Sequence, residues 1–509
     1  FVVCDEAHML EPRVRDLVSE SVGDATLRDA ESELTRVIQP VEFDDRAASS
    51  TTADADLVRA ELEEAGVTLR ELKEVRDFLR DLREELDRRV TAFLEREHRG
   101  WKANLTDLPD AEIPLRDPTE PGQDDVSAWA EEAGYDGGTW ARAEPVGAVV
   151  ARILNEAEAE EGDSVDKERA APAAGRVLGE WYRNDHERYF REIELERTWN
   201  DVEPDDSWRR PYNARLAMQN CVPSDAIGEQ LAEFGGGVLM SATLAPLDVF
   251  EEVSGLGHLQ DEGRPVVERT YGLNFPEENR ESFAVDAPKF TYDNRGAPGE
   301  ALRASKARAG DETQTRQVYA DAIRDVARSP GNVLVGMPNY AEAEWAAETL
   351  RDLVDKPVLL DESSGDDATE ALKDDFFAGE SKVLVTSLRG TLTEGVDYRG
   401  DRLEAAVVCG VPIINTASPR TKAVRTAYDR AFGDGFTYAL TVPAVRKARQ
   451  ALGRVIRGPD EAGVRVLVDS RYARDSWDSV REFLPPTERE EFQPVSPDML
   501  SLGLDRFWD

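Results

Sequence analysis

The sequence predicts an α/β protein with two parallel-sheet lobes and a large helical insertion in the first lobe. Three observations support this prediction: short apolar runs without alternation, helical patterns between several of these runs, and one long tract that lacks strand signals. The chain has 509 residues, of which 40% are hydrophobic, so it can form more than one core.

Six short runs rich in β-branched residues are interpreted as strands. They lack polar alternation, which is typical of parallel strands buried on both faces. Between two of them, residues 340–354 carry a helical pattern with Trp345, Leu350 and Leu353 near one face, which indicates βαβ units. The six runs are residues 1–3, 236–240, 332–337, 382–387, 405–412 and 464–470.

Residues 20–215 contain no convincing strand. Within them, residues 56–97 repeat leucine and valine at spacings of three and four, from Leu69 to Leu86, which predicts long amphipathic helices. A helical insertion in an α/β domain is the simplest account, and a separate helical domain between two unrelated α/β domains is the alternative. The other expected segments are a loop at 107–125 and helices around 140–160 and 168–195.

The lobes are expected to be joined by a linker at residues 274–290, which are polar and contain proline. The predicted first lobe then comprises residues 1–20 and 216–280. The insertion comprises residues 21–215, and the second lobe residues 281–509.

The charge is strongly acidic, with 62 Lys and Arg against 104 Asp and Glu and a net charge of −42. The acid is spread along the whole chain, which favours the solvated surface of a protein from a salt-loving organism over an acidic tail. Residues 405–428 and 435–459 are exceptions, because they contain arginines and lysines but no acid. They predict a site for an anion such as phosphate, or alternatively buried segments flanked by extended arginines.

The sequence indicates neither a membrane protein nor a protein stabilised by disulfides. No run of 18 apolar residues is present, so we expect no membrane partner. Cys4, Cys221 and Cys409 are far apart and show no C-x-x-C spacing, which fits a protein in the reducing cytoplasm. Phe1 is not a natural start, so the true N-terminus is unseen.

The segment "CDEAH" places Asp5 and Glu6 at the carboxyl end of the first strand. Functional groups of open α/β sheets lie at this edge, where one carboxylate can hold a divalent cation and the other can polarise a water. A lone Asp-Glu pair is more often a solvated loop, but the full tetrapeptide after "FVVC" is much more specific.

Two further segments follow strands. In "MSATL" (240–244), Ser241 and Thr243 offer hydroxyl groups, although an N-cap or a Ser/Thr turn would use the same residues. In "TLTEGVDYRG" (391–400), Gly395 permits close approach of the backbone to a ligand and Asp397 can hydrogen-bond it, although this segment could be a simple turn.

The segment "QALGRVIR" (450–457) carries the most specific pattern. Gln450, Gly453, Arg454 and Arg457 have the spacing i, i+3, i+4 and i+7, which predicts one face of a helix. Two arginines beside an amide suit a phosphate whose charge grows during transfer. The alternative is an exposed basic helix face.

These four segments resemble, in order and spacing, motifs II, III, V and VI of superfamily 2 helicases. Their residues are similar to the motifs of the XPD/DinG branch, which comprises iron–sulfur DNA helicases that move 5′ to 3′. Further similar segments are "FPEENR" (275–280), "GNVLVGMPNY" (331–340) and "VLVDSRY" (466–472). The resemblance implies two RecA-like lobes and identifies the helical insertion as the Arch domain of that family.

The resemblance also implies site roles. Asp5 would bind Mg²⁺, and Glu6 would be the base for the water that attacks ATP. His8 would connect the ATP site with the DNA side through Ser241 and Thr243. Gln450, Arg454 and Arg457 would contact the γ-phosphate, with Gly453 leaving room for it, while Gly395 and Asp397 would line the nucleotide site.

The activity implied is that of an ATP-dependent DNA helicase, which couples hydrolysis to 5′–3′ movement on single-stranded DNA and to duplex unwinding in DNA repair. The expected partners are ATP and single-stranded or duplex DNA, for a monomer that works with repair proteins. The alternatives are a helicase or translocase for RNA or RNA–DNA hybrids, and a non-catalytic scaffold derived from a helicase.

The chain departs from the family pattern at its start. It contains no Gly-Lys dipeptide, so the phosphate-binding G-K-[ST] loop is missing. The four cluster cysteines of the family are missing as well, and both features lie upstream of DEAH. We therefore expect an N-terminally truncated fragment that is inactive by itself, with the 4Fe–4S cluster in the missing part.

Overall fold

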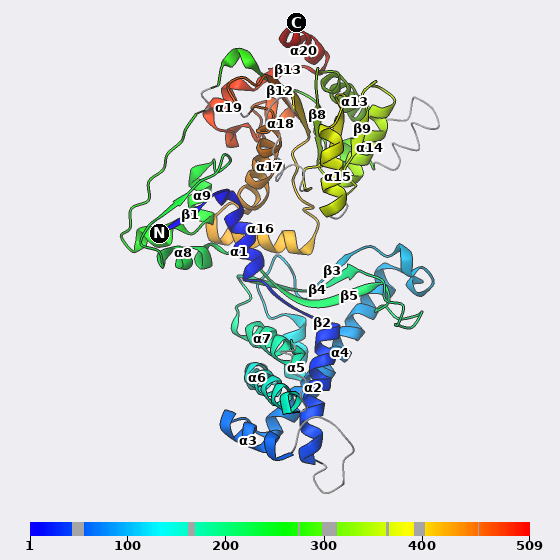
Figure 1. The fold of residues 1–509 in the computed structure, drawn as a ribbon, viewed down its shortest axis with the longest axis vertical. Coiled ribbons are helices and arrows are strands. Elements are labelled where there is room, and N and C mark those ends of the chain that lie inside the picture. The colour runs from blue at the N-terminus through cyan, green and yellow to red at the C-terminus, as the bar shows by residue number, and fades with distance from the viewer. Residues whose placement is uncertain are drawn as a thin grey trace. The chain divides into compact units, whose positions relative to one another are not determined.

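The computed structural model describes residues 1–42, 55–160, 168–272, 275–297, 313–362, 366–390, 403–456 and 458–509. The chain forms two compact units (Figure 1). Unit 1 consists of Phe1–Leu10, Ile227–Asn415 and Phe436–Asp509, and unit 2 of Glu11–Ala226 and Thr416–Gly435.

Unit 1 contains a seven-stranded sheet with the order β13-β7-β12-β11-β8-β10-β9, in which every neighbouring pair is parallel. The predicted α/β class is confirmed by this sheet. Its strands are β7 (Arg280–Val285), β8 (Val333–Met337), β9 (Val358–Leu360), β10 (Val383–Ser387), β11 (Ala405–Cys409), β12 (Gly463–Val468) and β13 (Gln493–Val495).

Successive residues of the central strands point into two different cores. Val333 and Val335 of β8 belong to a core that also contains side chains of α13, α14 and α20, whereas Leu334 belongs to a core with side chains of α15, α17 and α18. Figure 1 shows α14 and α17 on opposite sides of the sheet. The helices are α13 (Gln314–Ala327), α14 (Tyr340–Arg351), α15 (Asp366–Phe377), α17 (Val442–Leu452), α18 (Ser470–Ala473) and α20 (Leu500–Trp508).

A second parallel sheet of unit 1 pairs β1 (Val2–Cys4) with β6 (Gly237–Leu239). Both strands were expected, but the expected burial on both faces is wrong, because Val3 is 56% and Val238 45% exposed. The apolar residues of these two strands therefore reflect the preference of β-branched side chains for extended backbone. The remaining helices of unit 1 are α8 (Ser224–Ala232, which spans the boundary), α9 (Leu247–Val253), α10 (Leu256–Asp261), α11 (Tyr292–Arg295) and α19 (Pro486–Glu491).

The predicted linker at 274–290 is also wrong in part. Residues Arg280–Val285 form β7, which pairs with β12 on one side and β13 on the other. The strand could not be recognised in the sequence because it begins with the polar residues "RES". In the structure these residues have partners: Arg280 forms an ion pair with Glu491 at 2.8 Å, and Ser282 accepts a hydrogen bond from Arg465.

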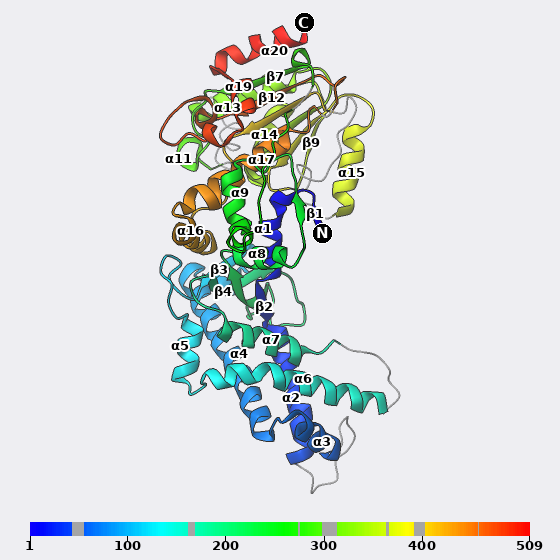
Figure 2. The same ribbon diagram turned by 90° about the vertical axis from the view of Figure 1, so that its left-hand side faces the viewer.

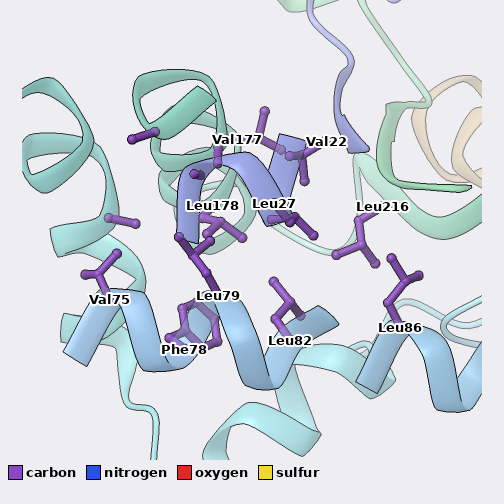
Figure 3. Close-up of a cluster of buried hydrophobic side chains, with 14 of the residues drawn as sticks. Val22, Leu27, Val75, Phe78, Leu79, Leu82, Leu86, Val177, Leu178 and Leu216 are labelled. Carbon is purple, nitrogen blue, oxygen red and sulfur yellow. The ribbon is translucent and has the colours of Figure 1, made fainter. Parts of the chain in front are cut away.

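Unit 2 is built mainly from helices. The periodic residues 56–97 form α3 (Ala55–Ala65) and α4 (Leu69–Glu97), as predicted. Thr68 begins α4 with a capping box, in which the Thr68 hydroxyl accepts from the Glu71 N–H and the Glu71 carboxylate accepts from the Thr68 N–H. The apolar face of α4 is buried in the core of unit 2 (Figure 3). The other helices are α1 (Leu10–Leu17, which spans the boundary), α2 (Asp24–Glu42), α5 (Asp125–Glu132), α6 (Gly137–Glu160), α7 (Ala170–Arg183) and α16 (Pro419–Phe432).

Two glycines let α6 and α7 pack closely. A Cβ atom at Gly147 of α6 would lie 2.3 Å from the Ala171 carbonyl oxygen, and one at Gly175 of α7 would lie 2.3 Å from the Ala143 carbonyl oxygen. Figures 1 and 2 show the two helices side by side.

The expectation that residues 20–215 lack strands is wrong. Unit 2 contains a four-stranded antiparallel sheet with the order β2-β5-β4-β3. Charged residues interrupt the apolar pattern of β4, where Arg191 and Glu192 are both fully buried, so the strand signal is lost in the sequence. The strands are β2 (Glu20–Gly23), β3 (Ala111–Pro114), β4 (Tyr189–Arg197) and β5 (Tyr212–Asn220).

The two units differ from the predicted domains, because unit 1 contains parts of both predicted lobes and unit 2 also takes residues 11–20, 216–226 and 416–435. Residues 416–435 were assigned to the second lobe, but α16 belongs to unit 2. Its Ala423 and Ala427 are buried with Phe190 and Cys221, and its Arg420 donates hydrogen bonds to Glu192 and Glu194 of β4. These contacts join residues that are more than 200 positions apart, which no local pattern reveals.

Among the described residues, no helix combines the length and the apolar character that a membrane span requires.

Candidate active site

The tips of β1 and β6 bring the first two predicted segments together. The two strands are parallel neighbours, with Cys4 opposite Leu239, so the residues that follow each strand lie at the same edge. The Ala7 N–H donates to the Met240 carbonyl over 2.9 Å and continues the pairing beyond both strands. Asp5 and Glu6 therefore follow β1 at the same edge where Ser241 and Thr243 follow β6.

Glu6 has an unusual backbone. Its φ of 49° and ψ of 44° are left-handed, and it is the one non-glycine residue with positive φ in the part of the chain that the structure describes. Such a conformation costs about 1 kcal/mol or more and is typical of functional sites. The Glu6 N–H donates to the Asp5 carboxylate over 2.9 Å, and the Glu6 side chain is 63% exposed. The local fold thus presents the Glu6 carboxylate to solvent.

A chain of hydrogen bonds connects Glu6 with His8. The Ser241 hydroxyl donates to Oε2 of Glu6 over 2.9 Å, and the same hydroxyl oxygen lies 2.8 Å from Nδ1 of His8. Because the hydroxyl has one proton and gives it to Glu6, it accepts from His8, so His8 carries its proton on Nδ1. Nδ1 also lies 3.3 Å from Oε2 of Glu6.

The chain continues to Gln450 near the end of α17. The Gln450 amide nitrogen donates to Nε2 of His8, which fits a histidine that is protonated on Nδ1. The same amide nitrogen lies 3.4 Å from the Thr243 hydroxyl, which in turn lies 3.4 Å from the Ser241 hydroxyl. We call Gln450, His8, Ser241 and Glu6 the relay; it joins three of the four predicted segments.

The predicted helix over 450–457 ends early. Helix α17 stops at Leu452, and the Gly453 N–H caps it by donating to the Arg449 carbonyl over 2.8 Å. Arg454 follows the helix and is 8% exposed. The expectation that Gln450, Gly453 and Arg454 share one helical face is therefore wrong, since glycine has low helix propensity and the helix ends there. Arg457, Gly395 and Asp397 lie outside the described residues.

One arginine of each acid-free stretch contacts acidic residues that lie elsewhere in the chain. Arg420 pairs with Glu192 and Glu194, and Arg449 holds Glu488 with two bonds of 2.7 Å. The expected anion site is therefore wrong for these two arginines, because other parts of the chain supply their carboxylates.

The described residues contain no group of three or more His, Cys, Asp or Glu side chains that could hold a metal ion. Mg²⁺ that accompanies a nucleotide needs only one or two protein carboxylates in addition to the phosphates. The Asp5 carboxylate, exposed at the strand tip, fits this lesser requirement. Cys4 is a free, half-buried thiol at the end of β1.

One candidate residue was missed by the sequence reasoning. Trp477 follows α18 and is 95% exposed, and the Lys289 ammonium lies 5.6 Å from the centre of its ring. Lys289 also pairs with Asp478. The signal was available, because "RDSWDSVR" places a tryptophan in a polar stretch that has no apolar periodicity.

Residues 323–487 match the sequence profile of the family described as Helicase C-terminal domain. The chain is 27% identical over 266 residues to the XPD helicase subunit of general transcription and DNA repair factor IIH from Schizosaccharomyces pombe. This alignment covers 49% of the chain and 32% of that relative. The XPD/RAD3 subunit from Saccharomyces cerevisiae is 25% identical, with the same coverage. The chain thus spans about a third of the length of these curated relatives.

A bacterial relative also matches. The ATP-dependent helicase DinG from Mycobacterium tuberculosis (strain ATCC 25177 / H37Ra) is 30% identical over 168 residues, which is 32% of the chain and 24% of that protein. Among solved structures, one described as XPD helicase and the Xpd4 structure from S. tokodaii each align with 97% of the chain. Both have a TM-score of 0.47 and 15% identity, and the alignments cover 68% and 75% of those chains, respectively.

Proposed function

The chain belongs to the XPD/DinG-type helicases of superfamily 2, and we propose that it forms part of an ATP-dependent DNA helicase. In this proposal the complete protein hydrolyses ATP at the sheet edge where Asp5 and Glu6 follow β1, and it moves 5′ to 3′ along single-stranded DNA. The observation that carries the proposal is the relay, because it connects an exposed carboxylate at a strand tip with the helicase C-terminal domain.

Glu6 is the proposed general base. Its carboxylate is exposed and can accept a proton from a water that attacks the γ-phosphate. The hydrogen bond from Ser241 orients the carboxylate. Asp5 would hold Mg²⁺, which supplies positive charge to the phosphate oxygens when the nucleotide is bound.

Gln450 is the proposed sensor of the nucleotide state. It lies on the helix that precedes Arg454, and the resemblance assigns Arg454 and Arg457 to the γ-phosphate. A displacement of α17 on hydrolysis would move the Gln450 amide relative to His8, and the change would reach Ser241 and Thr243. Gly395, Asp397 and Gly453 are proposed to line the nucleotide.

Trp477 is the proposed contact for single-stranded DNA. An almost fully exposed tryptophan offers a face on which a base can stack, and the adjacent Lys289 would exchange its ion pair with Asp478 for a phosphate of the backbone. The acidic surface elsewhere repels DNA, so a local contact of this kind is needed.

Further features are proposed from the similarity of the chain to its named relatives. The relatives named as DNA repair factor subunits support a role in DNA repair with repair proteins as partners. A 4Fe–4S cluster in a preceding segment, a monomeric state and a cytoplasmic location complete the proposal. The net charge of −42 suits a protein that is soluble at high salt.

The test is unwinding and ATP hydrolysis by the complete protein on matched DNA, RNA and hybrid duplexes that carry a 5′ or a 3′ single-stranded tail. We expect ATP-dependent unwinding of DNA with a 5′ tail. Preference for RNA or for hybrids would replace the DNA assignment, and no ATP hydrolysis on any substrate would favour a scaffold.

A further inference from the structure

We propose that Arg446 and Arg449 are positioning residues, which hold the Gln450 face of α17 against the loop 241–246. Neither arginine is among the site residues that the resemblance assigns, although both lie in the acid-free stretch 435–459. The inference adds to the proposed function two residues that act through the relay. The kinetic consequence of the inference rests on that proposed function.

The two arginines contact the main chain of the loop. Nη2 of Arg446 donates to the Leu244 carbonyl over 2.6 Å, and its Nε lies 3.4 Å from the Ala245 carbonyl. Nη2 of Arg449 donates to the Ala242 carbonyl over 3.3 Å. The loop is therefore held at both ends by guanidinium groups.

Gln450 completes the same face. Arg446, Arg449 and Gln450 have the spacing i, i+3 and i+4, so their side chains leave α17 on one side. The Gln450 amide nitrogen lies 3.4 Å from the Thr243 hydroxyl, between the loop positions that the arginines contact. The four consecutive loop residues from Ala242 to Ala245 thus each meet one side chain of α17.

Both arginines are almost fully buried. Arg446 is 6% and Arg449 is 8% exposed. The Arg449 guanidinium is fixed by its two bonds of 2.7 Å to Glu488 of α19, and the Arg446 guanidinium lies 5.9 Å from the centre of the Phe250 ring. Hydrogen bonds from a charged donor are strong when water is excluded.

The position of Gln450 relative to His8 follows from these contacts. Arg449 is the neighbour of Gln450, and Arg446 lies one helical turn before it. A shift of α17 along the loop that carries the amide away from Nε2 of His8 would also break the arginine–carbonyl bonds. The arginines therefore also determine which His8 nitrogen carries the proton.

The first test uses the 509-residue chain and the ¹⁵N spectrum of its histidines at constant pH. The chain has four histidines, so replacing His8 identifies its signals. We expect one His8 tautomer, protonated on Nδ1, in the parent chain. Arg446→Lys and Arg449→Lys should each give a mixture of tautomers, because a lysine ammonium lacks the planar fork that reaches these carbonyls.

The matched control is Arg264→Lys. Arg264 donates to the Ala232 and Phe234 carbonyls of unit 1, so it makes the same kind of bond away from the relay. Its replacement should leave the His8 spectrum unchanged, and thermal unfolding should confirm that all three variants fold. An unchanged His8 spectrum in both Arg446→Lys and Arg449→Lys would overturn the proposal.

The second test is a double-mutant cycle on kcat for ATP hydrolysis by the complete protein. Arg446→Lys should lower kcat about tenfold with KM for ATP nearly unchanged, and adding it to Gln450→Ala should cause little further loss. Additive losses would contradict action through Gln450. If the parent protein hydrolyses no ATP, the proposed function fails, while the His8 spectrum still decides the positioning role.

Discussion

The Gln450 amide donates a hydrogen bond to Nε2 of His8, although the two residues are 442 positions apart in the chain. His8 is also 2.8 Å from the Ser241 hydroxyl, which donates to Glu6. Every donor in this relay therefore has a defined acceptor, and the order of the bonds runs from the helicase C-terminal domain to the proposed base.

Breaking the relay at Gln450 should lower catalysis more than nucleotide binding. Gln450→Ala leaves Nε2 of His8 without its donor, so we expect kcat for ATP hydrolysis to fall about tenfold or more in the complete protein. Gln450→Glu offers an acceptor to Nε2 and should favour a doubly protonated His8. Steady-state kinetics over ATP concentration measure both variants, and a loss confined to KM would remove Gln450 from the relay.

Replacing Trp477 should weaken the binding of single-stranded DNA. Trp477→Ala removes the exposed ring, and we expect about a tenfold loss of affinity, while Trp477→Phe should keep most of it. Fluorescence anisotropy with a labelled oligonucleotide measures the dissociation constants. Trp199→Ala is the control, because Trp199 of unit 2 is 46% exposed and already engaged by Asp201. Equal losses for both tryptophans would show that Trp477 has no special role.

The stability of unit 2 should fall as the pH rises through neutrality. Burial raises the pKa of Glu192 to about 8, even though Arg420 beside it acts in the opposite direction. The unfolded carboxyl has a pKa of about 4.3, so between about pH 4 and pH 8 the folded state binds a proton that the unfolded state releases. The free energy of unfolding therefore decreases with pH over this window and is constant above it.

Urea unfolding of the 509-residue chain at a series of pH values measures this dependence. Glu192→Gln has no proton to release and should flatten the curve up to about pH 8. Glu194→Gln removes the second carboxylate that Arg420 contacts and should keep the slope. A slope that survives in Glu192→Gln would assign it to another group.

Alanine at either close-packed glycine should destabilise unit 2. The new Cβ atom at Gly147 or Gly175 would lie 2.3 Å from a carbonyl oxygen, so the helices must separate. We expect a loss of about 2 kcal/mol in the free energy of unfolding, although alanine is the better helix former. Gly235→Ala is the control, because no heavy atom lies within 4 Å of the new methyl group. Unchanged unfolding of Gly147→Ala and Gly175→Ala would contradict the close packing.

The parallel strands and the long amphipathic helices could be predicted from the sequence, because their patterns are local. The strands β8, β10, β11 and β12 are buried on both faces and rich in apolar residues, and α4 repeats its leucines with helical spacing. The XPD/DinG-type recognition is confirmed as well, since it rests on motifs of a few residues each.

The remaining features depend on contacts between distant residues. Strand β4 could not be recognised in the sequence because it contains the charged residue Glu192, which is buried against Arg420 of α16. The same contact joins α16 to unit 2 and not to the predicted second lobe. The stretch 435–459, which contains Arg446 and Arg449, was expected to hold an anion or to be a buried segment, since no sequence pattern shows that the partners of these arginines are carbonyl groups and Glu488. The site pairs Ser241–Glu6 and Gln450–His8 were anticipated only as roles, without the hydrogen bonds that connect them.

The role of Glu6 is tested most directly by Glu6→Gln in the complete protein, with ATP binding and ATP hydrolysis measured on the same preparation. Glutamine keeps the shape of the side chain and can still accept from Ser241, but it cannot take a proton from water. We predict that ATP binds as in the parent protein while kcat falls about 100-fold or more. Hydrolysis within a few fold of the parent rate would contradict the assignment of Glu6 as the base.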